Sequence, residues 1–193
     1  MHRFLINFKL IWRKNLSSLK GKDTALYSYL SHELLNYLTR ELQDFLLDSS
    51  ILPYLEPILC QEVLGDTRSE EKINELHLMG LLSQVESNTT LWRFHHLIRE
   101  FLLERALNIR SPEYIVSLRR RAAVHLEKNG NIDQALEQLA ACADWPKAAD
   151  LILAYAEPYF LENGCHNILY SWIKTLPIDY LNSHHQLLYY KGI

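Results

Sequence analysis

The chain has 193 residues, of which 48% are hydrophobic and 22% charged, a composition that argues against a disordered or a membrane-embedded protein. Its formal net charge is −3, but residues 1–23 carry six Lys or Arg side chains against the single acidic residue Asp23. The rest of the chain has eight more acidic than basic residues, which argues against a broad nucleic-acid-binding face.

The N-terminal sequence MHRFLINFKLIWRKNL is both hydrophobic and basic. Asn7, Lys9, Arg13 and Lys14 interrupt its apolar run and no small-residue cleavage site follows, so it does not fit a secretory signal peptide. An amphipathic helix on a membrane surface is one interpretation. We favour the other, in which residues 1–23 are the remnant of a preceding domain.

The three cysteines, Cys60, Cys142 and Cys165, are odd in number, far apart and without a Cys-x-x-Cys pair. This pattern is typical of reduced thiols rather than of a disulfide framework. We therefore expect a cytoplasmic protein.

Residues 24–52 have the spacing of two helices. In TALYSYLSHELLNYL (24–38) leucine recurs at every fourth position after Thr24, a suitable N-cap, which predicts an amphipathic helix. The segment TRELQDFLLDSS continues as a second short helix with Leu42, Phe45 and Leu46 on its apolar face.

Two more helices and a hairpin are expected next. PYLEPILCQEVLG opens at Pro53 and is closed by Gly65, and TRSEEKINELHLMG is closed by Gly80. LLSQVE and LWRFHH then flank the polar turn SNTT, which predicts a β-hairpin, and HLIREFLLERAL resumes helical spacing. Helices followed by a hairpin are the outline of a winged helix, which we predict for residues 24–106.

Residues 107–193 are predicted to form helical hairpins. LEKNGNIDQALEQL (126–139) aligns with FLENGCHNILYSWI (160–173) at an offset of 34 residues, which superposes the two Asn-Gly pairs. This offset is the period of the tetratricopeptide repeat (TPR). The predicted fold class is therefore mainly α, a winged helix followed by an incomplete set of TPR-like antiparallel helical hairpins.

Nucleotide hydrolysis by this chain is not expected. SLKGKDT contains a Gly-Lys pair, but a P-loop also needs a glycine where Leu16 stands and Ser or Thr where Asp23 stands. No Gly-x-Ser-x-Gly nucleophile motif is present, so we predict a non-enzymatic protein.

A metal site is not expected either. The candidates are the pairs His95/His96, His184/His185 and Cys165/His166, and adjacent side chains diverge on a helix or strand. No histidine pair at i,i+4 supports a site. The arginines at 119–121 are interpreted as a solvated helix face, although arginine is also suited to pairing with a partner's acidic groups.

The third helix of the predicted winged helix is unsuited to DNA. Its carboxylates, Glu70, Glu71 and Glu75, outnumber the cations Arg68 and Lys72 and would face phosphates. Packing within the protein is the favoured role for this winged helix.

The segments YLSHELLNYLTRELQDFLLDSSIL, LCQEVLG, LMGLL and LWRFHHLIREFLLERAL together resemble the MalT-like, LuxR-type transcriptional regulators, which belong to the signal-transduction (STAND) ATPases. LRRRAAVHLEKNGNIDQALEQLAACADWPKAADLI is similar to the start of their TPR-like sensor arm, and LYSWIKTLP to their recurrent Trp-x-x-x-Leu-Pro. The resemblance covers about residues 25–190. The nucleotide-binding P-loop and the LuxR-type DNA-binding helices of the family are absent from this sequence.

This resemblance implies one candidate site residue. In such ATPases a histidine at the start of the helix after the wing contacts the β-phosphate of ADP, and Phe94-His95-His96-Leu97 is similar to that motif. The cofactor-binding role therefore falls on His95, with ADP or ATP held by a full-length homologue and no cofactor in this chain. His96 is expected to serve packing or helix capping, and Trp92, Phe94, Leu97 and Phe101 are expected to pack the corner.

The resemblance implies a non-catalytic regulatory module in which the winged helix couples an ATPase switch to a TPR-like arm. Its expected partners are the nucleotide-binding domain of a full-length homologue and an effector, either a small molecule or a protein, on the helical repeats. The alternative is a stand-alone adaptor that binds proteins through its helical hairpins. A winged-helix DNA-binding repressor is disfavoured by the acidic third helix.

Overall fold

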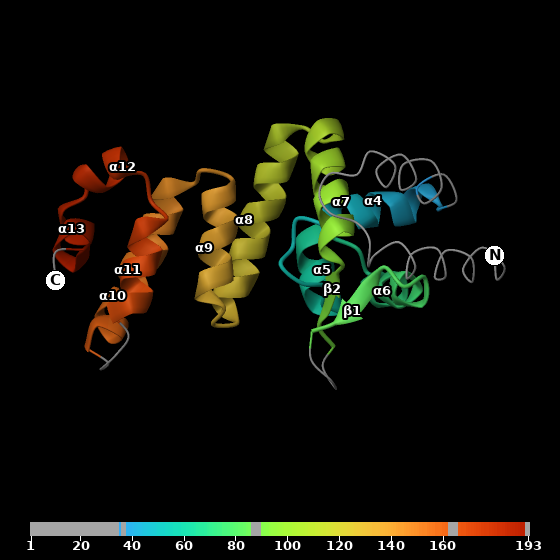
Figure 1. Ribbon diagram of the computed structural model, residues 1–193, viewed down its shortest axis with the longest axis horizontal. Helices are drawn as coiled ribbons and strands as arrows, with labels where there is room; N and C mark the ends of the chain where they lie inside the picture. Colours follow the sequence, from blue (N-terminus) through green and yellow to red (C-terminus); the bar gives the residue numbers. More distant parts are fainter. Residues whose placement is uncertain (1–34, 36–37, 86–89, 162–165, 192–193) are drawn as a thin grey trace. The chain divides into compact units, whose positions relative to one another are not determined.

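The computed structural model of the protein describes Leu35 and residues 38–85, 90–161 and 166–191 (Figure 1). The chain separates into two compact units, residues 1–114 and residues 115–193. The basic segment 1–23, Asn163, Gly164 and Cys165 lie outside the described residues, as does most of the helix expected over 24–38. The two described leucines of that predicted helix, Leu35 and Leu38, are buried.

The first helix of this unit with described bounds is α4 (Arg40–Ser49), which confirms the expected second helix. The hydroxyl of Thr39 caps it by accepting a hydrogen bond of 3.4 Å from the backbone N–H of Leu42. Leu42, Phe45 and Leu46 are buried, as their spacing predicts. Helix α4 packs against α5 (Pro57–Leu64) and α7 (His96–Ile109).

Helices α5 (Pro57–Leu64) and α6 (Ser69–Leu78) follow. Each is terminated by a glycine with positive φ, Gly65 at 74° and Gly80 at 79°, as the sequence indicates. The expected start of α5 at Pro53 is wrong, because Pro57 is the proline that occupies the first turn. The residues between these prolines instead carry a strand-like segment at Leu55.

The wing is a two-stranded antiparallel sheet of β1 (Leu82–Gln84) and β2 (Trp92–Phe94). Leu82 lies opposite Phe94 and Gln84 opposite Trp92, which confirms the predicted hairpin. Leu55 adds an isolated bridge to its outer edge, where the two backbone hydrogen bonds between Leu55 and Trp92 measure 2.7 and 2.9 Å. Part of the expected turn, residues 86–89, lies outside the described residues.

Helix α7 (His96–Ile109) completes the first unit and packs against α4. The core of this unit consists of large aliphatic side chains that are almost completely buried, among them Leu46, Ile51, Leu52, Leu55, Leu59, Ile73, Leu76, Leu81 and Ile98. Each buried side chain of this kind contributes about 2 kcal/mol through the hydrophobic effect. Residues of α4, α5, α6 and α7 thus share one core.

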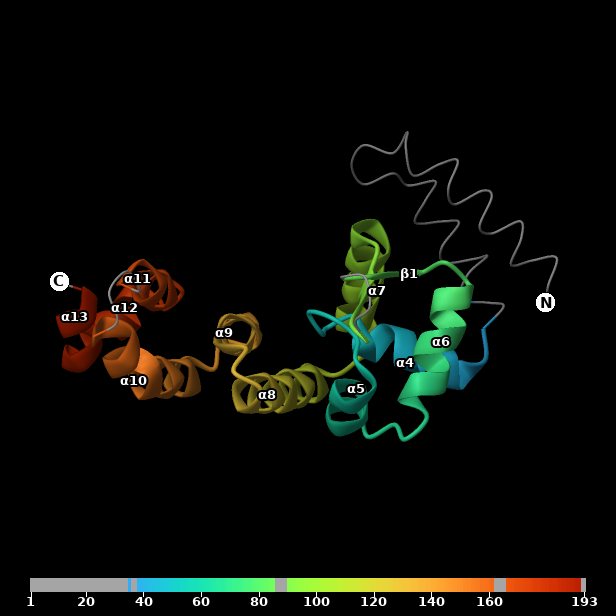
Figure 2. The same ribbon diagram turned by 90° about the horizontal axis from the view of Figure 1, so that it is seen from below.

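The second unit is entirely helical in its described residues. Its helices are α8, which begins at the end of the first unit (Pro112–Lys128), α9 (Ile132–Ala141), α10 (Trp145–Leu161), α11 (His166–Lys174), α12 (Ile178–Asn182) and α13 (His185–Lys191). Helices α8, α9 and α10 run down, up and down in Figure 1, so α8 and α10 are parallel. Seen from below in Figure 2, α8 and α10 form one layer and α9 and α11 the other. The mainly α fold class is thus confirmed.

Gly130 makes the sharp turn between α8 and α9. Its φ is 75°, and the backbone N–H groups of Gly130 and Asn131 bond to the carbonyl oxygens of Glu127 and Leu126 at the end of α8. This is the left-handed ending that glycine favours. The Asn-Gly pair at 129–130 therefore has a structural role in this turn.

Two polar side-chain contacts join helices of the second unit. Nη1 of Arg119 on α8 donates a hydrogen bond of 3.0 Å to Oε1 of Gln138 on α9, and both side chains are buried. The interpretation of the arginines at 119–121 as a solvated face is therefore wrong for Arg119. Nε1 of Trp172, in the Trp-x-x-x-Leu-Pro segment, donates to Oδ1 of Asp133 at the start of α9.

Candidate functional site

The candidate site lies at the corner where β2 becomes α7. His95 is the N-cap residue of α7, with an extended backbone at φ −58° and ψ 138°. Its backbone N–H bonds to the carbonyl oxygen of Leu81, which leads into β1, and its own carbonyl oxygen accepts from the N–H of Arg99 at 2.9 Å. Both backbone polar groups of His95 are therefore hydrogen-bonded, which fixes the position from which its ring extends.

The side chain of His95 makes no capping hydrogen bond to its own helix. It is half-buried, and its ring centroid lies 4.7 Å from that of His96. Burial and the neighbouring charge of His96 lower the pKa of His95 below its usual value of 6.5. At neutral pH the ring is thus an uncharged imidazole with one N–H to donate, beside the positive end of a helix dipole.

His96 is the first residue of α7 and is exposed. The expectation that it caps the helix or packs is wrong, because the cap position belongs to His95. The predicted packing of the corner holds for Phe94 and Phe101, which are buried. Trp92 and Leu97 are only half-buried, and the Trp92 ring lies against His77 of α6 with 4.3 Å between centroids.

Arg68, the N-cap residue of α6, and Lys72 within this third helix of the winged helix are both engaged in ion pairs. Arg68 pairs with Glu41 of α4, and Lys72 pairs with Asp66 and lies over the Phe45 ring. Burial alone would raise the pKa of Asp66, but hydrogen bonds from Lys72 and from the Arg68 backbone, together with their charges, lower it. Asp66 therefore remains a charged partner for Lys72.

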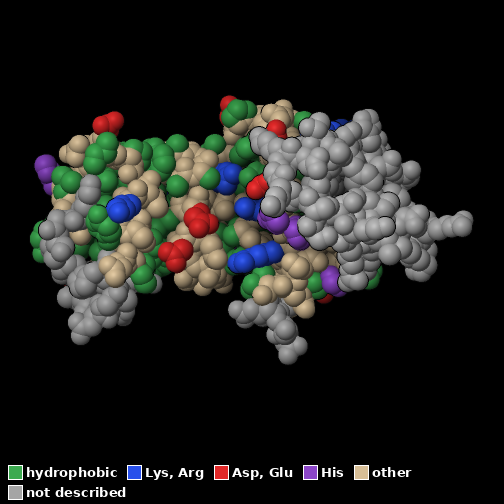
Figure 3. All heavy atoms as spheres, in the orientation of Figure 1, with side chains coloured by type: hydrophobic (Ala, Val, Ile, Leu, Met, Phe, Trp, Pro, Cys, Tyr) green, Lys and Arg blue, Asp and Glu red, His purple; other side chains and the backbone are tan. Residues whose placement is uncertain are grey.

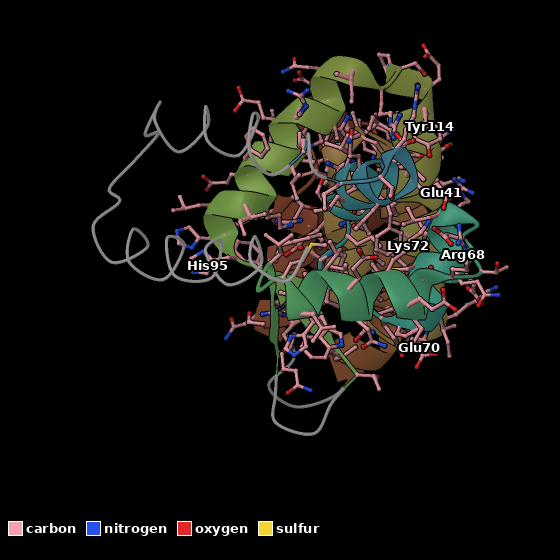
Figure 4. All side chains as sticks on the ribbon, turned by 90° about the vertical axis from the view of Figure 1, so that its right-hand side faces the viewer. Glu41, Arg68, Glu70, Lys72, His95 and Tyr114 are labelled. Carbon is pink, nitrogen blue, oxygen red and sulfur yellow. The ribbon has the colours of Figure 1, made fainter. Side chains whose placement is uncertain are left out.

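The carboxylates of α6 form no ion pair with any residue that the structure describes. Glu70, Glu71 and Glu75 are exposed. Figure 4 shows Arg68, Lys72 and Glu41 together at one side of the first unit, while His95 lies at the other. The corner and the acidic face of α6 are therefore two separate features.

The structure also brings together a polar cluster that the sequence did not predict. Arg110, which ends α7, donates from Nη2 to Asp44 and from Nε to Asp48, at 2.6 and 2.8 Å, and both acids lie on α4. Burial alone would lower the pKa of Arg110, but the two carboxylates raise it. Contacts across more than sixty residues leave no local signal in the sequence.

The remaining reactive side chains do not form a metal site in the described part of the chain. Among the residues that the structure describes, no group of three or more His, Cys, Asp or Glu side chains is placed to hold a metal ion. Burial raises the pKa of the Cys60 thiol to about 12, so this cysteine is a protonated core side chain. In the described part of the chain no helix is long and apolar enough to span a membrane.

Comparison with known proteins gives the family of the first unit. Residues 31–114 match the model of the MalT winged helix domain. The chain is 29% identical over 136 residues, 70% of its length, to the HTH-type transcriptional regulator MalT of Vibrio cholerae. It is 26% identical over 164 residues, 84% of its length, to MalT of Cronobacter sakazakii.

A further relative has a different name. The chain is 29% identical over 138 residues, 71% of its length, to the serine/threonine-protein kinase PknK of Mycobacterium tuberculosis. The matched segments are 12% of PknK and 15% and 18% of the two MalT proteins, so the chain spans less than a fifth of each relative.

Proposed function

Residues 31–114 belong to the MalT winged helix domain family, and from this premise we propose that the chain is a regulatory module. The winged helix couples an ATPase switch domain to a TPR-like helical arm that binds an effector or partner. Its partner on one side is a nucleotide-binding domain of the same type as in full-length regulators, in the cytoplasm. Its partner on the other side is an effector held by α8 to α13.

The observation that carries this proposal is the position of His95. A neutral imidazole at the N-terminus of a 14-residue helix can donate its N–H to a phosphate oxygen that the helix dipole also attracts. Because its side chain makes no capping bond to α7, such a contact would not compete with one. The ring is suited to distinguish ADP from ATP by the presence of the γ-phosphate.

The nucleotide site and the effector site would be coupled because ADP and the effector each bind one arrangement of the protein more tightly than the other. ADP would favour the arrangement in which the winged helix rests on the nucleotide domain, and effector binding to the arm would favour its release. The engaged cations and exposed carboxylates of α6 support a protein-facing rather than a DNA-facing winged helix.

The proposal is tested in a chimeric Vibrio cholerae MalT whose winged helix is replaced by residues 31–114 of this chain. The chimera should retain ADP, and His95→Ala should speed ADP release about tenfold, as expected for the loss of one hydrogen bond to a charged group. His96→Ala is the matched control, because its ring is exposed at the next position. Equal ADP release in the His95→Ala chimera and its parent would refute the sensor role.

A further inference from the structure

The second unit contains a hollow between its two parallel helices α8 and α10. Its volume is about 360 Å³, within the range of roughly 300–1,000 Å³ that is usual for ligand sites. The lining residues come from one stripe on each helix and a floor residue on α9; they are Arg120, Ala123, Val124, Glu127, Leu139, Lys147, Asp150, Leu151 and Ala154.

The two walls have the same construction. On α8 the stripe begins with Arg120 and ends with Glu127, and on α10 Lys147 comes first and Asp150 follows one turn later. Since the two helices are parallel, both cations lie toward one end of the hollow and both carboxylates lie farther along it. The hollow therefore has a basic end and an acidic end.

The middle of the hollow is apolar. Ala123, Leu139 and Leu151 are buried there, whereas Val124 has 46% of its surface exposed. An exposed branched aliphatic side chain within a hollow offers contact area to an apolar group of a ligand. On the face of the second unit that Figure 3 shows, charged side chains are interspersed among hydrophobic ones instead of gathered into one patch.

The basic end is held in place. Nε of Arg120 donates a hydrogen bond of 2.6 Å to Oδ2 of Asp144, whose side chain is buried at the start of α10. The Arg120 side chain is still 49% exposed, so it remains accessible to a ligand. Lys147 is exposed and forms no ion pair with any residue that the structure describes.

The length of the hollow sets the size of its occupant. From Arg120 to Glu127 the helix rises by about 10 Å, and an extended chain covers about 3.3 Å per residue, so about three residues fit. We propose that this hollow binds an extended peptide segment of a partner protein with the order acidic, apolar, basic. The acidic side chain lies at Arg120 and Lys147, the apolar one over Val124, and the basic one at Glu127 and Asp150.

This inference rests on the proposed function, since it assigns a site and a ligand class to the sensor arm. A peptide is favoured over a uniformly charged ligand such as a nucleic acid, because a single-sign ligand would meet carboxylates at one end. Charged groups at both ends of the hollow would also select a ligand more specifically than an apolar helix face would.

The test is a titration of the 193-residue chain with acetyl-Gly-Asp-Leu-Lys-Gly-amide, followed through the NMR signals of the Ala123, Val124 and Ala154 methyl groups. These signals should shift and saturate, whereas the neutral peptide acetyl-Gly-Asn-Leu-Gln-Gly-amide should bind at least about fivefold more weakly. Equal binding of the two peptides, or shifts confined to other methyl groups, would overturn the proposal.

Charge variants separate this site from non-specific attraction. Lys147→Glu should weaken binding of the Asp-Leu-Lys peptide at least about fivefold and make a Lys-Leu-Lys peptide the preferred ligand. Arg121→Glu is the matched control, because Arg121 is an exposed α8 cation that does not line the hollow, and it should leave the preference unchanged. An equal effect of both variants would contradict the assignment.

Two other occupants of the hollow would give different results. If the natural ligand is a small zwitterion, free lysine or aspartate should bind as tightly as the peptide. If it is a second copy of the chain, the protein should form a concentration-dependent dimer that Lys147→Glu abolishes. Either result overturns a peptide site. If the 193-residue chain binds the peptide but the MalT chimera does not retain ADP, only the proposed function is contradicted. ADP retention without peptide binding would contradict this inference alone.

Discussion

The phenolic oxygen of Tyr114 donates a hydrogen bond of 2.8 Å to Oδ2 of Asp48, a residue 66 positions earlier in the chain. The other carboxylate oxygen of Asp48 accepts from Arg110 at 2.8 Å, and the Arg110 guanidinium lies 5.8 Å from the centre of the Tyr114 ring. Both oxygens of this nearly buried carboxylate are thereby satisfied. The end of α7 and the residues that follow it are tied to α4.

Removing these partners should destabilise the first unit to different degrees. Tyr114→Phe removes one hydrogen bond and should cost about 1 kcal/mol of unfolding free energy. Arg110→Met should cost about 2–3 kcal/mol, because it also leaves Asp48 without its cation. Urea denaturation followed by circular dichroism measures both. Arg105→Met, at an exposed cation on the same helix, should change stability by less than about 0.5 kcal/mol, and an equal loss there would contradict the assignment.

The buried pair of Arg119 and Gln138 should show energetic coupling. Gln138→Leu leaves the Arg119 guanidinium buried with fewer partners, and Arg119→Met leaves the amide oxygen without its donor. Each exchange should cost about 2 kcal/mol, while the double variant should cost at least about 1 kcal/mol less than the sum. A double-mutant cycle by urea denaturation checks this, and strict additivity would show that the contact contributes nothing.

At Gly130 there is space for a side chain, but the backbone conformation there disfavours any residue other than glycine. A Cβ atom at this position would meet no atom within 4 Å, yet φ is 75°. Gly130→Ala should therefore destabilise the protein by about 1 kcal/mol through backbone strain alone. Gly130→Asn should cost less, because asparagine adopts left-handed φ more readily. Thermal unfolding of both variants provides the measurement, and equal losses would point to a cause other than φ.

The lowered pKa of His95 predicts a loss of stability in acid. Because the folded state disfavours the protonated ring, the unfolded chain binds protons more tightly, and stability falls as pH drops below about 6.5. His95→Gln should reduce the difference in stability between pH 7.5 and pH 5.5, a direction set by linkage. His185→Gln serves as the control, because His185 is an exposed histidine in the second unit. An NMR titration that placed the His95 pKa above 6.5 would contradict this expectation.

Duplex DNA should bind this chain weakly. With Arg68 and Lys72 engaged in ion pairs, α6 offers exposed carboxylates to a phosphate backbone. Titration with random-sequence duplex at low salt should show no tight complex. Strong binding that weakened steeply as salt was added would indicate phosphate contacts and would favour the repressor interpretation.

The sequence predicted the elements whose signals are local. The spacing of Leu42, Phe45 and Leu46 marked α4, Gly65 and Gly80 marked the ends of α5 and α6, and the change of period after Gly80 marked the wing. Each of these features depends on neighbours within about one turn or one hairpin. Local patterns therefore sufficed for the fold class.

What the sequence missed depends on distant partners. Nothing near Leu55 indicates that its backbone pairs with Trp92, and this pairing is one reason why the helix begins at Pro57 and not at Pro53. Likewise the run of arginines at 119–121 looked uniform, although the first of them is buried and donates a hydrogen bond to Gln138. The candidate site came from resemblance to a family, because a histidine at a strand-to-helix corner has no distinctive local pattern.

The bridge between Leu55 and Trp92 has a consequence for hydrogen exchange. Both of its hydrogen bonds use backbone N–H groups, so the amide protons of Leu55 and Trp92 are sheltered from water by the same contact. The wing edge cannot separate without also freeing the segment that leads into α5. These two amides should then exchange at similar rates although they lie in different parts of the sequence, which makes the wing and the entry to α5 one cooperative opening unit.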